Sequence, residues 1–326
     1  MRELTFGQAV KEALAEELRR DERVFIIGED VAEAGTTFKV LLGLVDEFGP
    51  ERVMDSPISE AGITGLAVGA AMTGMRPVVD IMFGDFLTLA MDQIVNQAAK
   101  VHYMSGGRLR VPMVVRTTMG AGRRSAAQHS QSLHAFVAHV PGLKVVVPAT
   151  PYDAKGLLKS AIRDDNPVIF FEDKMMYQLK GPVPSDDYTV PLGVAEVKRA
   201  GEDVTLVATS SMVHVGLAAA DRLESIGIRM EVVDVRTLVP LDSHTLVESA
   251  KKTGRAIVVD EGYQRYGVTA EIASVIAQGA FYQLDAPVAR IGAMDVPIPF
   301  SPPLEDLTIP TAERVVEVAR ALCGRA

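Results

Sequence analysis

The stretch from Asp55 to Met82 reads DSPISEAGITGLAVGAAMTGMRPVVDIM and pairs one helix with one strand. Small and apolar residues fill the helix predicted over 60–73, and Glu60 is the only charged residue between Asp55 and Arg76. The mostly apolar run 77–82 is typical of a strand buried on both faces. A helix that leads into such a strand is the repeating unit of a parallel α/β sheet, because a parallel crossover needs about a dozen residues.

The same alternation extends in both directions along the chain. Thr5 and Gln8 form a capping-box pattern, and apolar residues then recur at helical spacing from Phe6 to Leu18. In the N-terminal part, strands are predicted over 24–27, 77–82, 112–117, 143–147 and 168–171, and helices over 60–73, 86–104 and 151–163. In the C-terminal part, strands are predicted over 204–208, 230–235 and 256–259, and helices over 213–225, 243–252, 269–278 and 312–322.

Residues 181–191, GPVPSDDYTVP, interrupt this alternation. The segment contains three prolines and two acidic residues without any periodicity, which is typical of a linker between domains. We therefore predict an α/β protein with one domain over residues 1–180, a linker over 181–191 and a second domain over 192–326.

The composition limits the classes of function. Lysine and arginine total 33 against 42 aspartate and glutamate, and the resulting charge of −9 disfavours binding to nucleic acid or to anionic membranes. The single cysteine, Cys323, allows neither an internal disulfide nor a cysteine-based zinc site. The N-terminal residues lack an apolar signal core, and the longest charge-free run contains three histidines. We expect a cytoplasmic protein with no membrane span and no nucleic-acid partner.

Common nucleotide-binding, hydrolase and zinc motifs are absent or incomplete. The run GAGRRS at 120–125 is close to a dinucleotide fingerprint, but Ser125 replaces the third glycine and the next acidic residue is Asp153. Neither a P-loop nor a GxSxG pattern occurs. His129, His134 and His139 are spaced by five residues, which on a helix rotates each about 140° from the last, so a shared zinc site is not predicted.

Glu60 and His129 are the two candidate site residues that the pattern itself indicates. Glu60 begins a helix rich in small residues, which we expect to be buried against another backbone at a subunit interface. Burial there is expected to raise the pKa of Glu60 toward neutrality, and the alternative is an ordinary acid favoured by the helix dipole. His129 follows a glycine-rich loop at the end of a predicted parallel strand, where open α/β sheets bind ligands; the alternative is a packed histidine.

Several segments together resemble a known family over nearly the whole chain. They resemble the β subunit of the thiamine-diphosphate-dependent dehydrogenase component of 2-oxo acid and acetoin dehydrogenase complexes. The segments are DSPISEAGITGLAVGAAMTGMRPV, DQIVNQAAK, YMSGG, AAQHSQS, PGLKVV, PYDAKGLLKSAIRDDNPVIFFE and DVRTLVPLD.

The resemblance implies two doubly wound α/β domains, a pyrimidine-binding domain followed by a transketolase C-terminal-like domain. It implies that Glu60 hydrogen-bonds a nitrogen of the cofactor's aminopyrimidine ring, which favours the imino tautomer that deprotonates the thiazolium carbon. Ile58 and Phe86 would contact the cofactor, with the ring of Phe86 against the pyrimidine. His129 would reach toward the substrate and the lipoyl sulfur as a proton donor.

The resemblance also implies partners and ions. A Gly-Asp-Gly motif, which in such enzymes holds Mg²⁺ on the diphosphate, does not occur here. The chain is therefore expected to bind half of the cofactor, to leave magnesium to an α subunit in an α2β2 assembly, and to serve a dihydrolipoyl acyltransferase core with its lipoyl domain. In some members a loop holds a structural potassium ion, and the matching residues are Ala161, Ile162, Asp164 and Asn166.

The sequence is consistent with more than one substrate and with more than one function. The segments DIMFGDF and GAGRRSAAQHSQ are closer to acetoin dehydrogenases, with pyruvate dehydrogenases intermediate and branched-chain 2-oxo acid dehydrogenases less close. A split transketolase has the same domains, but AAQHSQS lacks the Thr-His-Gln of that enzyme. An inert scaffold subunit would not need Glu60, Phe86 and His129 together.

Overall fold

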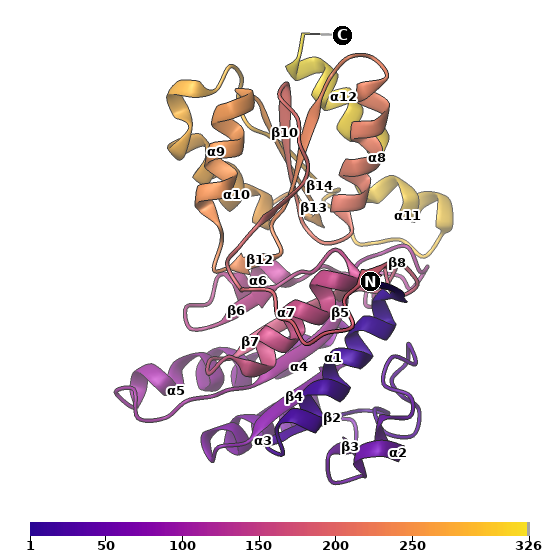
Figure 1. Cartoon of the computed structure of the whole chain (residues 1–326), viewed down its shortest axis with the longest axis vertical. Helices are drawn as coiled ribbons and strands as arrows, with labels where there is room; N and C mark the ends of the chain where they lie inside the picture. Colours follow the sequence, from indigo (N-terminus) through magenta and orange to yellow (C-terminus); the bar gives the residue numbers. More distant parts are fainter. Residues whose placement is uncertain (325–326) are drawn as a thin grey trace. The chain divides into compact units, whose positions relative to one another are not determined.

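The computed structural model describes residues 1–324 and divides the chain into two compact units. The first unit comprises Met1–Met119 and Phe136–Leu192, and the second comprises Gly120–Ala135 and the chain from Gly193 onward. Each unit is built on a mostly parallel sheet with helices on its faces, so the predicted α/β fold is confirmed (Figure 1).

The first unit contains a parallel sheet with the strand order β6-β7-β5-β4-β2-β3. All residues of β2, β4, β5 and β7 are buried, which explains why their apolar residues are consecutive rather than alternating with exposed polar ones. The strands are β2 (Val24–Gly28), β3 (Val53–Asp55), β4 (Arg76–Ile81), β5 (Val114–Met119), β6 (Lys144–Val146) and β7 (Val168–Asp173).

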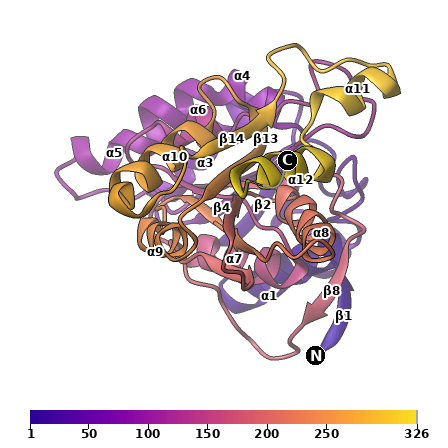
Figure 2. The ribbon, with the colours of Figure 1, turned by 90° about the horizontal axis from the view of Figure 1, so that it is seen from above.

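Helices cover both faces of this sheet. One face carries α1 (Phe6–Arg20) and α7 (Pro151–Arg163), and the other carries α3 (Glu60–Met72), α4 (Leu87–Asp92) and α5 (Ala99–Met104) (Figures 1 and 2). The capping box predicted at the start of α1 is present, with the Thr5 and Gln8 side chains each bonded to the other's backbone N–H. The remaining helical elements around this sheet are α2 (Leu44–Phe48), η1 (Gly84–Phe86) and α6 (His134–Ala138).

The helix predicted over 86–104 is observed with a change of winding in its middle. Between α4 and α5, the residues of η2 (Gln93–Ala98) form a π-helical segment. Such π-helical turns are rare in proteins, and those that occur are often near functional sites. Helix propensity alone does not predict them.

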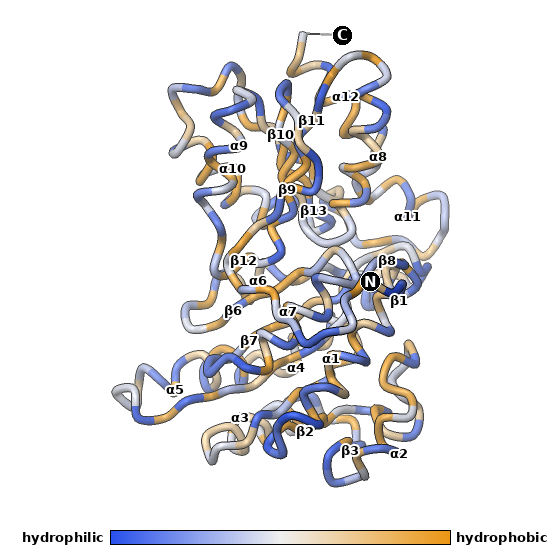
Figure 3. Tube along the Cα trace, in the orientation of Figure 1, coloured by the Kyte–Doolittle hydropathy of each residue, from blue (hydrophilic) through white to orange (hydrophobic). Residues whose placement is uncertain are grey.

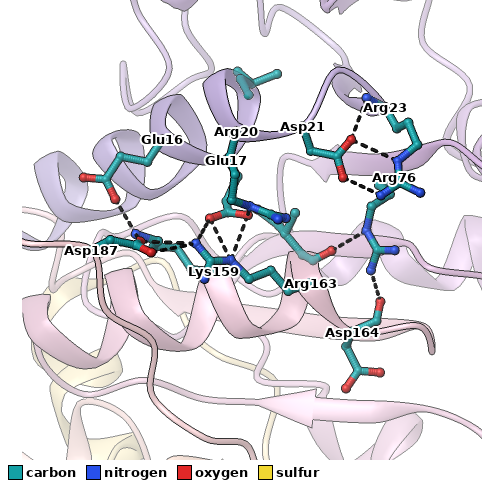
Figure 4. A network of polar contacts seen from close by, with 12 residues as sticks. Glu16, Glu17, Arg20, Asp21, Arg23, Arg76, Lys159, Arg163, Asp164 and Asp187 are labelled. Atoms are coloured by element: carbon teal, nitrogen blue, oxygen red, sulfur yellow. Dashed lines mark hydrogen bonds and ion pairs between the residues drawn. The ribbon is translucent and has the colours of Figure 1, made fainter.

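A network of charged side chains joins α1 to α7 (Figure 4). The Lys155 and Lys159 side chains are fully buried, and Glu16 accepts from both, with Lys155 Nζ at 2.7 Å. Arg163 donates to the buried Glu17 at 2.7 Å. Because Lys155, Lys159 and Arg163 lie four residues apart on α7, all three face α1, where Glu16 and Glu17 neutralise their charges.

The segment expected as a linker, 181–191, packs against the first unit over much of its length. Its first residues belong to β8 (Lys180–Val183), which pairs antiparallel with β1 (Arg2–Thr5). Further along, Val190 is buried and its N–H donates to Gly156 O at 3.1 Å. A Cβ on Gly156 would lie 2.5 Å from the Val190 side chain, so only glycine allows this close approach.

The second unit has a five-stranded sheet in the order β14-β13-β10-β11-β9, in which only β9 is antiparallel. Helices α8 and α12 cover one face and α9 and α10 the other (Figure 2). Hydrophobic residues follow the central strands β10 and β11, which are buried throughout (Figure 3). The elements are β9 (Glu196–Arg199), β10 (Val204–Ala208), α8 (Met212–Glu224), β11 (Met230–Asp234), β12 (Thr237–Val239), α9 (Ser243–Thr253), β13 (Ala256–Tyr263), α10 (Val268–Gly279), η3 (Phe281–Gln283), β14 (Ala289–Ala293), α11 (Pro302–Thr308) and α12 (Ala312–Leu322).

Among residues 1–324, no helix combines the length and the apolar character needed to cross a bilayer.

Candidate functional site

The order of the strands places the predicted cofactor residues at one edge of the first sheet. After β2 the chain moves to the edge strand β3 and then returns to β4 on the other side of β2. Open α/β sheets bind ligands at the carboxyl ends of the strands where the order reverses in this way. Ile58 and Glu60 follow β3 and Phe86 follows β4, so the fold brings these three residues to the same edge.

Glu60 is the first residue of α3 and is buried, with an exposed fraction of 7%. The preceding residue, Ser59, caps the helix by accepting a hydrogen bond from Gly62 N–H at 3.3 Å. A carboxylate in the first turn interacts favourably with the positive end of the helix dipole. The side chain is thus held at a defined point at the edge of the sheet.

Glu29, which the sequence interpretation missed, lies beside Glu60 at the end of β2. Burial raises the pKa of the Glu29 carboxyl, and the nearby charge of Glu60 raises it further, while a hydrogen bond from Ser59 N–H opposes the shift. Its Oε1 atom is buried and has no hydrogen-bond partner among residues 1–324. Two neighbouring carboxyl groups, one with unused acceptor capacity, favour a ligand that brings hydrogen-bond donors. The sequence signal was an acid directly after a buried strand.

Phe86 belongs to a row of aromatic rings. Its centroid lies 5.6 Å from that of Phe83, which lies 5.8 Å from Phe38, and Phe38 lies 5.2 Å from Tyr177. The Lys174 ammonium lies 5.3 Å from the Phe83 centroid. Phe86 is half-buried, and its contact with Phe83 restricts the orientation of its ring.

Ile58 differs from the other predicted cofactor residues because its side chain is 82% exposed. An exposed isoleucine at the same edge as Glu60 offers apolar surface for a ligand or a partner.

A buried ion cluster lies in the sheet below this edge. Arg116 on β5 binds both oxygens of Glu172 on β7 at 2.6 and 2.8 Å, and it also pairs with Asp80 on β4. The Tyr177 hydroxyl donates to Glu172 at 2.8 Å. Burial raises the pKa of Asp80 to about 6, although the Arg116 guanidinium opposes the shift. One guanidinium cannot fully neutralise two buried carboxylates, so Asp80 retains a proton more readily than a solvated aspartate.

His129 lies in the segment Gly120–Ala135, which belongs to the second unit. It is half-buried, and its backbone N–H donates to Ala126 O at 3.4 Å. His134 is buried and bonds Asp260 at 3.0 Å, whereas His139 is exposed. Among residues 1–324, no group of three or more His, Cys, Asp or Glu side chains is arranged to hold a metal ion.

The four residues predicted to hold potassium lie at the C-terminal end of α7, with Ala161 and Ile162 in its last turn and Asp164 and Asn166 in the turn that leads to β7. The Arg76 guanidinium donates to Ile162 O at 2.8 Å and to Asp164 O at 2.5 Å. The Asp164 carboxylate pairs with Lys144 and accepts from Asn166 N–H at 2.9 Å. The turn is therefore rich in oxygen acceptors and lies away from Glu60.

Among residues 1–324, no backbone atom of another element lies close to Gly65 or Gly69 of the glycine-rich helix α3. A Cβ on Gly69 would meet nothing within 4 Å, and one on Gly65 would lie 3.5 Å from the Gln93 side chain. Leu66 on the same helix is 53% exposed. Helix α3 therefore presents a partly exposed, small-residue surface in the single chain, and its burial at a subunit interface stays a prediction.

Comparison with known proteins agrees with this architecture. Residues 2–180 match the family model for the transketolase pyrimidine-binding domain, and residues 193–315 match that for the transketolase C-terminal domain. The β subunit of acetoin:2,6-dichlorophenolindophenol oxidoreductase from Bacillus subtilis (strain 168) is 50% identical over 99% of this chain and 98% of that protein. The chain belongs to this family of dehydrogenase β subunits. Thiamine diphosphate is the cofactor of the family, and the resemblance inferred from the motifs is confirmed.

Other members of the dehydrogenase β-subunit family are similarly close. The pyruvate dehydrogenase E1 component subunit beta of Rhizobium meliloti is 48% identical over 99% of this chain and 70% of that protein. The 2-oxoisovalerate dehydrogenase subunit beta of Bacillus subtilis is 45% identical over 98% of both chains. A solved structure entitled split gene transketolase, inactive beta4 tetramer, has a TM-score of 0.80 and 26% identity, and the match covers 98% of both chains.

Proposed function

We propose that this chain, together with an α subunit, is the dehydrogenase component that cleaves pyruvate or acetoin and transfers the acyl group to lipoamide of an acyltransferase core. The observation that carries the proposal is the buried Glu60 at the start of α3, beside Glu29 and at the same sheet edge as Phe86. The relatives at 45–50% identity carry names for acetoin, pyruvate and 2-oxoisovalerate enzymes, so identity does not rank the substrates.

The residues of this edge fit the aminopyrimidine half of thiamine diphosphate. Its ring carries both donors and acceptors, and Glu60 and the unused Oε1 of Glu29 offer matching carboxyl groups. When bound, the cofactor supplies the nucleophilic carbon that attacks a substrate carbonyl.

The residues of this chain then have separate tasks. Glu60 holds a proton at a ring nitrogen of the aminopyrimidine, and Phe86 fixes the plane of that ring. Ile58 contributes apolar contact that excludes water from the ring. His129 donates a proton toward the lipoyl sulfur during acyl transfer. Magnesium and the diphosphate are left to the α subunit, because this chain lacks the Gly-Asp-Gly motif.

Turnover of the reconstituted αβ enzyme tests the substrate class. Initial rates with pyruvate, acetoin and 3-methyl-2-oxobutanoate, measured with an artificial electron acceptor, are expected to favour pyruvate or acetoin. A strong preference for the branched substrate would replace the proposal with a branched-chain 2-oxo acid dehydrogenase. Activity only on sugar phosphates would indicate a split transketolase, and no activity on any of them a scaffold subunit.

The isolated chain is expected to bind thiamine diphosphate and magnesium weakly, because it supplies only the aminopyrimidine side of the site. The similar split-gene transketolase structure is described as an inactive β4 tetramer, which agrees with dependence on a second subunit. Calorimetry should give a dissociation constant far above about 1 µM for the isolated chain, and a much lower one for the αβ enzyme. Micromolar binding by the isolated chain contradicts the shared site.

Replacing His129 with Ala is expected to leave cofactor affinity nearly unchanged while slowing transfer to lipoamide by about 10²–10⁴-fold. The reason is that His129 belongs to the second unit, whereas the residues proposed to hold the aminopyrimidine belong to the first. Calorimetry with the cofactor and a lipoamide acylation assay measure the two effects. A loss of cofactor affinity would assign His129 a structural role instead.

We also propose that a potassium ion binds the turn formed by Ala161, Ile162, Asp164 and Asn166 as a structural ligand. Each carbonyl oxygen has two lone pairs, so those that accept from Arg76 can still contact a cation. Exchange of potassium chloride for choline chloride at equal ionic strength should lower Tm by about 2–4 °C. Identical melting curves in the two salts would exclude the ion.

A further inference from the structure

The segment that carries His129 is anchored by carboxylates of the second unit on both sides of the histidine. The carboxylates belong to Asp260 and Glu261 on β13 and to Glu305 on α11, and all three are buried. The anchoring contacts are Ala121 N–H to Glu261 Oε1 at 2.7 Å, Gly122 N–H to Glu305 Oε1 at 2.7 Å, and His134 Nε2 to Asp260 Oδ2 at 3.0 Å.

Glu305 makes the anchor nearest to His129 on its N-terminal side. One oxygen accepts from Gly122 N–H, and the other pairs with Arg124 at 2.7 Å. The Glu305 side chain has an exposed fraction of 0%. A buried carboxylate is stable only when hydrogen-bond donors contact it. If the loop moved away, the Glu305 carboxylate would lose both Gly122 N–H and Arg124, so the buried charge favours the docked loop.

Arg124 has a backbone conformation that needs such an anchor. Its φ of +57°, like the +59° of Ala126, lies in the left-handed region, which is unfavourable for residues other than glycine. The same guanidinium nitrogen that binds Glu305 also binds Asp306 at 2.7 Å and Pro302 O at 3.2 Å. These contacts offset the strain and fix the path of the loop five residues before His129.

We propose that Glu305 and Arg124 are positioning residues, which hold the loop so that His129 meets the acyl acceptor in one orientation. The inference rests on the proposed role of His129 in acyl transfer. The proposal gives α11 an indirect role in acyl transfer, because Glu305 on this helix acts through the loop and not on the reacting atoms. Since a displacement of about 1 Å can slow a reaction about 10²-fold, a loosened loop is expected to affect acyl transfer most.

Two variants of the αβ enzyme test this assignment. Glu305→Gln keeps the side-chain volume and an oxygen for Gly122 N–H but removes the charge that binds Arg124. Arg124→Gly removes the guanidinium and relieves the strained φ, while Gly122 N–H still donates to Glu305, so it tests the anchor through a second, independent change. Both are expected to increase hydrogen exchange of the amides of residues 121–130 by about tenfold or more.

The same variants should affect the two half-reactions to different extents. Transfer to the lipoyl domain is expected to fall about tenfold to a hundredfold, while turnover with an artificial electron acceptor changes by less than about twofold. The matched control is Glu313→Gln, which breaks the exposed pair of Glu313 with Arg222 in the same unit and should change neither reaction nor the exchange.

Three results would overturn the proposal. Unchanged exchange over residues 121–130 in both variants means that Glu305 and Arg124 do not anchor the loop. Increased exchange with normal acyl transfer means that the anchor does not position His129. Equal loss in both half-reactions with a lower Tm means a general structural role. If His129→Ala itself transfers normally, the proposed function of His129 fails, whereas the exchange data still test the anchor.

Discussion

Replacing Glu60 with Ala in the αβ enzyme is expected to lower turnover by about 10²–10⁴-fold, the range for loss of a positioned proton-transfer group. The carboxyl group is buried at the start of α3 and lies beside Glu29, so water cannot easily substitute for it. The direct measurement is hydrogen–deuterium exchange of the thiazolium proton of bound thiamine diphosphate, which should slow in parallel with turnover.

Two further variants define the cause of this loss. Glu60→Gln keeps a hydrogen-bonding side chain of similar volume and is expected to retain more cofactor affinity than Glu60→Ala, while still exchanging the proton slowly. Glu22→Ala, at an exposed position before β2, should behave as wild type. If Glu60→Ala and wild type exchange the thiazolium proton at the same rate, the assignment of Glu60 is wrong.

Replacing Arg116 with Met is expected to destabilise the chain by about 3–5 kcal/mol, because it leaves the buried carboxylates of Asp80 and Glu172 without their cation. Unfolding by urea, followed by circular dichroism, measures the free energy. The exposed Arg222→Met, which breaks only a surface pair, should change it by no more than about 1 kcal/mol. Equal effects of the two variants would mean that the cluster contributes no more than a surface pair.

The pH dependence of this cluster follows from Asp80. Its folded pKa of about 6 is above its ordinary value of 3.8, so the folded state binds the proton more tightly than the unfolded state. The stability that Asp80 contributes is complete below about pH 4 and is lost as the pH rises through about 6. The Arg116→Met penalty should therefore be larger at pH 8 than at pH 5, because the Asp80 carboxylate is charged at the higher pH and then needs its cation.

The strands that the sequence predicted are those whose residues are all buried, such as β2 and β7, because a fully buried strand is a continuous apolar run. The three-residue β3 and the half-exposed antiparallel β9 have neither a run nor a clear alternation, and they were missed. The first residues of 181–191 form strand β8 through pairing with β1, a long-range contact that prolines and acids in the sequence do not indicate.

Within the candidate site, Glu60 could be predicted because it is an isolated charge in a long apolar stretch. Glu29 was missed because two adjacent acidic residues, Glu29 and Asp30, are also typical of an ordinary surface turn. The anchor residue Glu305 was missed for a different reason. Its contacts with Gly122 and Arg124 depend on the three-dimensional arrangement of residues that are more than 180 positions apart in the sequence.

The membership of Gly120–Ala135 in the second unit also constrains synthesis of the protein. Ala121 leaves the ribosome 140 residues before its partner Glu261. At a translation rate of roughly 5–20 residues per second, the loop that carries His129 has no anchoring carboxylates for on the order of ten seconds. A fragment from Gly193 onward would conversely have Glu261 and Glu305 without the loop that satisfies them. The two units are therefore poor candidates for separate expression, and the loop around His129 is accessible to proteases and chaperones until the second unit has been made.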